Sequence, residues 1–187
     1  DQENYKIDYV SGNLTINRRE ITLTARGQEK SYGDELILDN TAFTLTDKDN
    51  NSGLPNNENI TKLSLSSVTN KNTSTVAAPD TYKNEIEVDG ILASNITASN
   101  YDITYVRGNL TINRREITLT ASGQEKIYGD AISLGNTAFT TLDKDGDSVL
   151  PNGELVDTVT LVSANGVDAS TDSDVGTYAD NISITPT

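Results

Sequence analysis

The sequence predicts an all-β protein, made of tandem β-sandwich-like repeat domains of immunoglobulin-domain size that are arranged end to end. Three observations support this prediction. A 31-residue segment recurs after 96 residues, apolar and polar residues alternate along it, and the sequence contains no convincing amphipathic helix. Alternation with a period of two is typical of half-buried strands. A period near 96 residues matches the roughly 100 residues of one β-sandwich domain.

The repeat consists of residues 4–34 and 100–130, which are identical at 26 of 31 aligned positions. The register continues without a gap, because Leu54-Pro55-Asn56 aligns with Leu150-Pro151-Asn152. Solenoid units are typically 20–50 residues long. The longer period therefore indicates complete small domains.

Alternating apolar residues predict the individual strands, and Thr, Ile, Val and Tyr supply the side chains that strands favour. Tight turns are expected at Ser11-Gly12-Asn13 and Arg107-Gly108-Asn109. The apolar positions are Tyr5, Ile7 and Tyr9, then Leu14 and Ile16, then Ile21, Leu23 and Ala25 in the first copy, and Tyr101, Ile103, Tyr105, Leu110, Ile112, Ile117 and Leu119 in the second.

The composition excludes several classes of function. The chain has 28 Asp and Glu against 14 Lys and Arg, a formal net charge of −14. Nucleic-acid binding needs a basic patch, and no apolar run approaches the ~18 residues of a membrane span. We therefore expect no nucleic-acid partner and no membrane insertion. The absence of Cys and His removes the usual nucleophile–base pairs and zinc ligands, so we expect no enzyme.

The same short motifs occur in the same order in both copies, and this order indicates a protein family. The segments KSYGD (residues 30–34) and KIYGD (126–130) each follow an ITLTA strand, which the pattern NYxIxYVxGNLTI precedes. This order resembles the MBG and YDG-type repeat domains of large bacterial surface adhesins. The resemblance implies a structural stalk or spacer repeat, located outside the cell at the bacterial surface and involved in cell adhesion or biofilm formation. Its expected partners are neighbouring repeats of the same chain.

The resemblance also implies repeat boundaries, because NYxIxxxxGxLTI ends a unit in that family. Residues 1–16 are then the C-terminal strands of a preceding repeat, 17–112 a complete repeat, and 113–187 a second repeat without its last strands. Alternative boundaries at 4–99 and 100–187 remain open.

Two expectations follow from the first set of boundaries. The Arg-Arg-Glu segments 18–20 and 114–116 lie at junctions, where they form either salt bridges between repeats or charged strand edges that resist aggregation. The incomplete repeat exposes a sheet edge, and residues 4–16 have the sequence of the missing strands. We therefore expect head-to-tail strand exchange between such fragments.

An acidic loop in each copy predicts Ca²⁺ as a cofactor that stiffens the domain. The segment 143–154 has the oxygen spacing of a twelve-residue calcium loop, with positions 1, 3, 5, 7 (a carbonyl) and 12. Ser148 at position 6 and Pro151 at position 9 depart from that pattern, and a solvated acidic hairpin loop is the alternative. The expected ligands are Asp143, Asp145, Asp147, Val149 and Glu154, and in the weaker first loop Asp47, Asp49, Asn51 and Glu58.

A second class of function stays open beside the spacer. The chain could be a module of the same adhesin that binds glycan or a host protein through its loops. Loops that differ between the copies, notably 66–80 against 162–176, favour this alternative. Loops also tolerate change without a functional reason.

Overall fold

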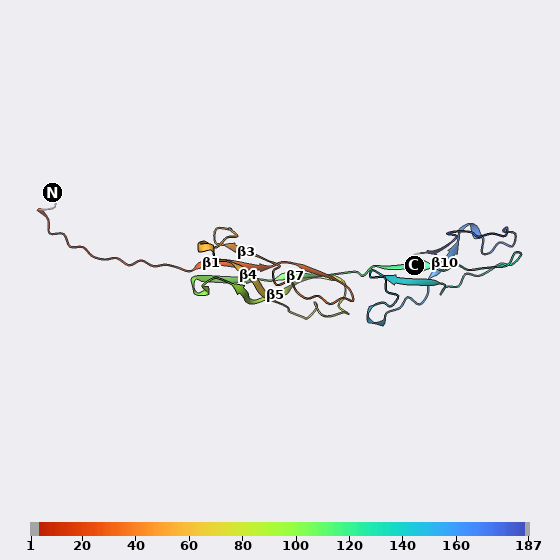
Figure 1. Cartoon of the computed structure of the whole chain (residues 1–187), viewed down its shortest axis with the longest axis horizontal. Coiled ribbons are helices and arrows are strands. Elements are labelled where there is room, and N and C mark those ends of the chain that lie inside the picture. The colour runs from red at the N-terminus through yellow and green to blue at the C-terminus, as the bar shows by residue number, and fades with distance from the viewer. Residues whose placement is uncertain (1–3, 186–187) are drawn as a thin grey trace.

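The strands of the computed structural model, which describes residues 4–185, form two groups along the long axis of the molecule (Figure 1). The N-terminal strand group, residues 19–113, contains β1 to β7, and the C-terminal strand group, residues 117–185, contains β8 to β11. Helical structure in the described residues is limited to 3₁₀ turns of three residues each. The all-β prediction is confirmed.

Two sheets make up the N-terminal strand group. In the three-stranded sheet, ordered β3-β1-β6, β6 is parallel to β1 and β3 is antiparallel to it. In the four-stranded sheet, ordered β2-β7-β5-β4, only the β2–β7 pair is parallel. The strands are β1 (Arg19–Ala25), β2 (Gln28–Ser31), β3 (Phe43–Asp47), β4 (Ile60–Ser67), β5 (Asp80–Ser94), β6 (Tyr101–Val106) and β7 (Gly108–Asn113).

Both sheets contribute side chains to one hydrophobic core. Alternate residues of β1 are buried, as the sequence predicts, and Ile21 and Leu23 contact the core from this sheet. Leu63, Ile86 and Leu110 enter the same core from the opposite sheet and are completely buried. Full burial of such a side chain stabilises the fold by about 1.5–3 kcal/mol.

The chain passes from one sheet to the other between β6 and β7. Only Arg107 separates the two strands, so the expected tight turn at residues 107–109 does not join a hairpin. Gly108 is buried at this crossing. A Cβ atom there would lie 2.6 Å from the carbonyl oxygen of Ala25 and 2.8 Å from that of Arg26, so only glycine permits the close approach.

The C-terminal strand group has four strands in two antiparallel pairs. These are β8 (Ile117–Ala121) with β9 (Phe139–Asp143), and β10 (Thr160–Ser163) with β11 (Ile182–Thr185). The β8–β9 register repeats that of β1–β3. Among the described residues, no strand pairs with β8 as β6 pairs with β1. As a result Ile117 is 43% exposed, whereas its counterpart Ile21 is 2% exposed.

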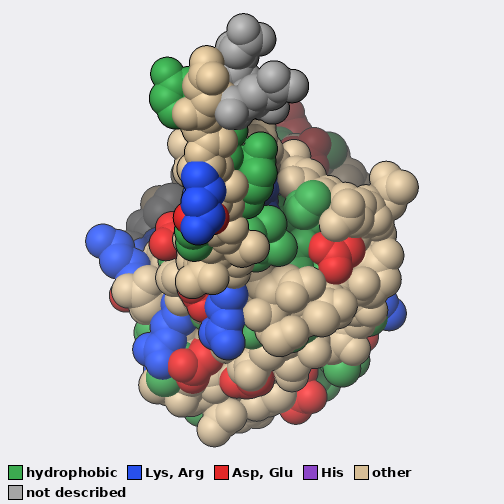
Figure 2. Space-filling view, turned by 90° about the vertical axis from the view of Figure 1, so that its left-hand side faces the viewer, with side chains coloured by type: hydrophobic (Ala, Val, Ile, Leu, Met, Phe, Trp, Pro, Cys, Tyr) green, Lys and Arg blue, Asp and Glu red, His purple; other side chains and the backbone are tan. Residues whose placement is uncertain are grey.

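Residues 4–16 precede β1 as an exposed segment that extends away from the strand groups (Figure 1). Hydrophobic side chains are visible on the face seen from this end of the molecule (Figure 2).

Within the described part of the chain, no helix has the length and hydrophobicity needed to span a membrane.

Candidate functional site around Arg115

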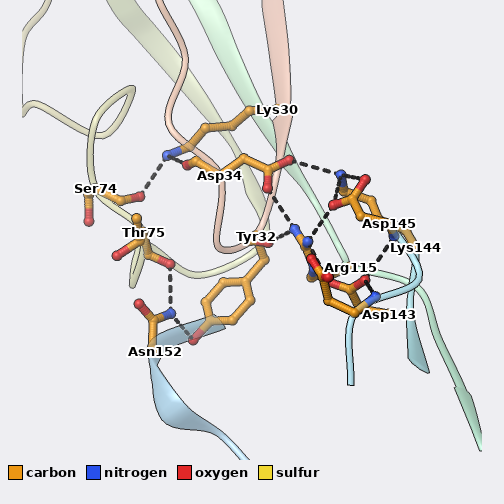
Figure 3. Close-up of polar contacts among 11 residues, drawn as sticks. Lys30, Tyr32, Asp34, Ser74, Thr75, Arg115, Asp143, Lys144, Asp145 and Asn152 are labelled. Atoms are coloured by element: carbon orange, nitrogen blue, oxygen red, sulfur yellow. Dashed lines mark hydrogen bonds and ion pairs between the residues drawn. The ribbon is translucent and has the colours of Figure 1, made fainter. Parts of the chain in front are cut away.

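Three residues, 114–116, connect β7 of the N-terminal strand group with β8 of the C-terminal strand group. The side chain of Arg115 is only 9% exposed. It lies among charged and polar groups from both strand groups (Figure 3). A connection this short brings the end of one group directly against the beginning of the next.

The Arg115 guanidinium binds three carboxylates. Its Nε and Nη2 donate to Oδ2 of Asp143 at 3.0 and 2.6 Å, and Nη2 also donates to Asp145 at 2.6 Å. Its Nη1 donates to Asp34 of the N-terminal strand group at 2.6 Å. Lys144 adds a second positive charge, 3.4 Å from the other oxygen of Asp34. The planar fork of arginine suits such simultaneous contacts.

The surrounding charges keep these groups ionised. Hydrogen bonds from Arg115, opposed by desolvation, lower the pKa of Asp143 to about 2, and the backbone N–H groups of Asp147 and Asp145 contribute further. Desolvation acts to raise the pKa of Asp34, but hydrogen bonds from Arg115 and Lys144 outweigh it and lower that pKa. The pKa of Arg115 is raised, mainly by Asp143.

The Tyr-Gly-Asp turn, residues 32–34, is the part of the N-terminal strand group that meets the acidic loop, residues 143–154. The Tyr32 hydroxyl donates to Oε1 of Glu154 at 2.6 Å, and Asn152 Nδ2 donates to the Tyr32 hydroxyl at 3.3 Å. Gly33 adopts a φ of +88°, and a Cβ atom there would overlap the ring of Pro151. The turn therefore needs glycine both for its backbone and for this contact.

Lys30 supports the turn from within its own strand group. Its Nζ donates to the carbonyl oxygens of Asp34, Asn72 and Ser74, at 3.0, 3.1 and 2.6 Å. The loop that carries Ser74 also reaches the second group, because Asn152 Nδ2 donates to the carbonyl oxygen of Thr75 at 3.0 Å. The Tyr-Gly-Asp turn and this loop thus both contact residues 143–154 (Figure 3).

An equivalent arginine contact exists inside the N-terminal strand group. Arg19 pairs with Asp47, whose carboxylate also accepts hydrogen bonds from the backbone N–H groups of Asp49 and Asn51. Arg115 repeats this contact with Asp143 and additionally reaches Asp34 of the other group. The predicted salt bridge across the junction is thus confirmed for Arg115, whereas Arg114 is exposed.

The structure disperses the expected calcium ligands over several protein partners. Asp143 and Asp145 meet at Arg115, and Glu154 binds Tyr32. Val149 is 70% exposed, and the backbone N–H of Asp147 donates to Asp143. In the first loop Asp47 and Asp49 lie near Arg19, Asn51 donates its backbone N–H to Asp47, and Glu58 accepts from the Tyr101 hydroxyl. Across residues 4–185, no cluster of three or more acidic side chains is arranged to hold a metal ion.

Two sheets closed over one core, with a Tyr-Gly turn at the end that meets the next strand group, define a small all-β domain. Residues 21–111 match the family model of the MBG domain (YGX type). Comparisons with curated proteins and with solved structures gave no match. The resemblance inferred from the motifs is therefore confirmed.

The Tyr-Gly-Asp segment was identified from the sequence only as part of a family motif, and its contact with the following loop was missed. The sequence contained one signal for this contact. The turn (32–34, 128–130) and the Leu-Pro-Asn loop (54–56, 150–152) recur together in both copies. Co-occurrence alone does not show that the turn of one repeat meets the loop of the next.

Replacing Gly33 by Ala is expected to loosen the contact between the two strand groups. The added Cβ overlaps Pro151, whereas Gly129, with a similar φ of +93°, has nothing within 4 Å of its Cβ position. Gly129→Ala therefore carries the same backbone strain without the overlap and is the matched control. NMR relaxation should show joint tumbling of the two groups in the wild type and in Gly129→Ala, and independent tumbling in Gly33→Ala. Joint tumbling in all three would contradict the contact.

Acid is expected to break the Arg115–Asp143 pair. The pKa of Asp143 in the folded protein lies below its ordinary value of 3.8. The contribution of the ionised Asp143 carboxylate to the free energy of unfolding is therefore fully present above about pH 4, and it is lost as the pH falls toward 2. Carboxyl-carbon NMR of Asp143 should give a midpoint near 2, which Arg115→Gln should move upward. A wild-type midpoint near 4 would show that the pair does not form in solution.

Calcium binding by the acidic loop stays a prediction, to which the structure adds a condition. A Ca²⁺ ion at Asp143 and Asp145 must displace Arg115, which occupies both carboxylates. We expect Arg115→Gln to bind Ca²⁺ more tightly than the wild type in calorimetric titrations. Lys62→Gln, a charge change outside the loop, is the control. If titration with Ca²⁺ gives no heat of binding for either the wild type or Arg115→Gln, the loop is not a calcium site.

Proposed function

We propose that the chain is a spacer of a bacterial extracellular adhesin, in which tandem β-sandwich repeats lie end to end and project a distant binding region from the cell surface. The observation that carries this proposal is the contact around Arg115. It joins consecutive strand groups through an ion cluster, the Tyr-Gly-Asp turn and a connection of three residues. A stiff array is what a spacer needs, because flexible joints would let the distal end fold back.

Strand pairing supports repeat boundaries at 17–112 rather than at 4–99 and 100–187. β6 and β7 complete the two sheets that begin with β1 and β2. A boundary at residue 100 would separate these partners. The family match over residues 21–111 fits the same division.

The loops that differ between the copies also fit a spacer. In the first copy Lys30 donates to the carbonyl oxygens of Asn72 and Ser74, and in the second Lys126 donates to those of Val167 and Ser170. Both lysines bind backbone atoms, which every residue provides. The loop sequence can therefore diverge while its support is retained, and divergence does not by itself indicate a ligand.

The match to the MBG family model supports a non-enzymatic role, with adhesion or biofilm formation at the cell surface as its setting. Calcium at residues 143–154 is a separate element of the proposal. It would stiffen the loop only by replacing the contact that Arg115 makes. The alternative, a glycan- or host-protein-binding module, uses the same surface location but requires a specific ligand.

The two functions differ in what they predict for the isolated chain. A spacer should show no saturable binding on glycan arrays or to extracellular-matrix proteins. Placed between a surface anchor and a known biotin-binding domain on bacteria, it should extend the reach of that domain, and Gly33→Ala should shorten the reach relative to Gly129→Ala. Saturable glycan binding by the isolated chain, with equal reach for both variants, would favour the binding module.

A further inference from the structure

The sequence contains two Asn-Gly pairs, Asn152-Gly153 in the acidic loop and Asn165-Gly166 in a 3₁₀ turn after β10. At such a pair the side-chain amide can be lost without an enzyme. The glycine backbone nitrogen gives up its proton and attacks Cγ of the asparagine, the bond from Cγ to Nδ2 breaks, and Nδ2 leaves as ammonia. Water then opens the succinimide ring to aspartate or isoaspartate. Glycine favours this reaction because it has no side chain to shield its nitrogen.

The two pairs have the same local backbone. Asn152 adopts φ 59° and ψ 14°, and Asn165 adopts φ 58° and ψ 17°. Both asparagines are exposed. In this conformation the glycine nitrogen points away from the asparagine Cβ, so the Cα–C bond must rotate before the ring can close. The local backbone therefore slows both reactions alike.

The surroundings of the two side-chain amides differ. Asn152 Nδ2 donates to the carbonyl oxygen of Thr75 at 3.0 Å and to the hydroxyl of Tyr32 at 3.3 Å, both in the N-terminal strand group. The preceding residue, Pro151, packs against the Tyr-Gly-Asp turn. The amide of Asn165, by contrast, makes no hydrogen bond within residues 4–185. The contact between the strand groups thus holds the leaving group of one pair and not of the other.

We propose that Asn152 is a deamidation site that the contact between the strand groups masks, and that its conversion keeps the two groups apart. Ring closure requires the amide to leave both acceptors and the backbone at Asn152 to rotate. The reaction therefore proceeds in the fraction of molecules in which the contact is open. Both steps require the contact near Arg115, and neither requires that the chain be a spacer.

The product opposes the contact that Asn152 makes. An aspartate at this position has no N–H to donate, and its carboxylate faces the carbonyl oxygen of Thr75. The Tyr32 hydroxyl already donates its proton to Glu154 at 2.6 Å, so it cannot satisfy the new carboxylate as well. Isoaspartate also adds a methylene carbon to the backbone, which displaces Pro151 from the turn. Deamidation thus replaces hydrogen bonds with repulsion.

The first copy supplies a variant that removes the reaction and keeps the loop. Its equivalent residues are Asn56-Asn57, and Asn57 adopts a positive φ of 57°. Gly153 has a φ of +73°, and nothing lies within 4 Å of its Cβ position. Gly153→Asn therefore restores the sequence of the first copy at a site that accepts it. Its side chain shields the attacking nitrogen, so most of the deamidation at residue 152 should be lost.

Incubation at mildly alkaline pH, followed by peptide mapping with mass spectrometry, tests the masking. Rates in denaturant give the intrinsic reactivity of each pair. Relative to those rates, Asn152 in the folded wild type should react about tenfold or more slowly than Asn165, because its hydrogen bonds must break first. Gly33→Ala, which overlaps Pro151, should remove most of this difference, whereas Gly129→Ala should leave it unchanged.

NMR relaxation tests the effect of the product. The two strand groups should tumble jointly in the wild type and independently in Asn152→Asp. Asn165→Asp adds the same charge outside the contact and should keep joint tumbling. On prolonged incubation at alkaline pH the wild type should lose joint tumbling, and Gly153→Asn should retain it.

Three results would overturn the proposal. Equal normalised rates at Asn152 and Asn165 in the folded wild type would show that the contact masks nothing. An Asn152 that does not react even in denaturant would remove the modification site. Joint tumbling of Asn152→Asp would show that the amide does not hold the strand groups together.

Discussion

The strand pair formed by β6 and β7 is the element on which the rest of the structure depends. It is the last part of its repeat in sequence, yet it pairs with β1 and β2, the first strands, and it contributes Tyr101, Leu110 and Ile112 to the core. Burial of each of the two aliphatic side chains, Leu110 and Ile112, stabilises the fold by about 1.5–3 kcal/mol. With this pair the N-terminal strand group has a closed core. Within the described residues no such pair covers β8, and Ile117 is 43% exposed where its counterpart Ile21 is 2% exposed.

The same pair determines how one repeat meets the next. β7 ends at Asn113 and β8 begins at Ile117, so the closing strand of one group leads into the first strand of the following group after only three residues. Arg115 sits in this connection and binds carboxylates on both sides of it. The Tyr-Gly-Asp turn adds contacts at Glu154 and Pro151. The strand that closes the core of one group and the connection that aligns the next group with it are thus adjacent parts of one segment.

Much of this architecture could be predicted from the sequence, because period-two alternation and a 96-residue repeat are local and repetitive signals. The alternation of buried residues in β1 and the all-β class are examples. The crossing between sheets at Gly108 could not be predicted, since a Gly-Asn pair between apolar runs has the same appearance in a hairpin turn. The acidic loop shows a similar limit. Its spacing fits calcium, but the spacing cannot reveal that Arg115 and Tyr32, distant in sequence, approach the same carboxylates.

Hydrogen exchange tests the closing role of the strand pair most directly. Amides of β2, β5 and β7 should exchange slowly, while those of residues 124–126 and 176–182 exchange fast. Addition of a peptide with the sequence of residues 100–113 should slow exchange at residues 124–126 and 176–182, the counterparts of the β7 partners, and leave β2 and β5 unchanged. Equal protection of the two strand groups without peptide, or no added protection with it, would contradict the account.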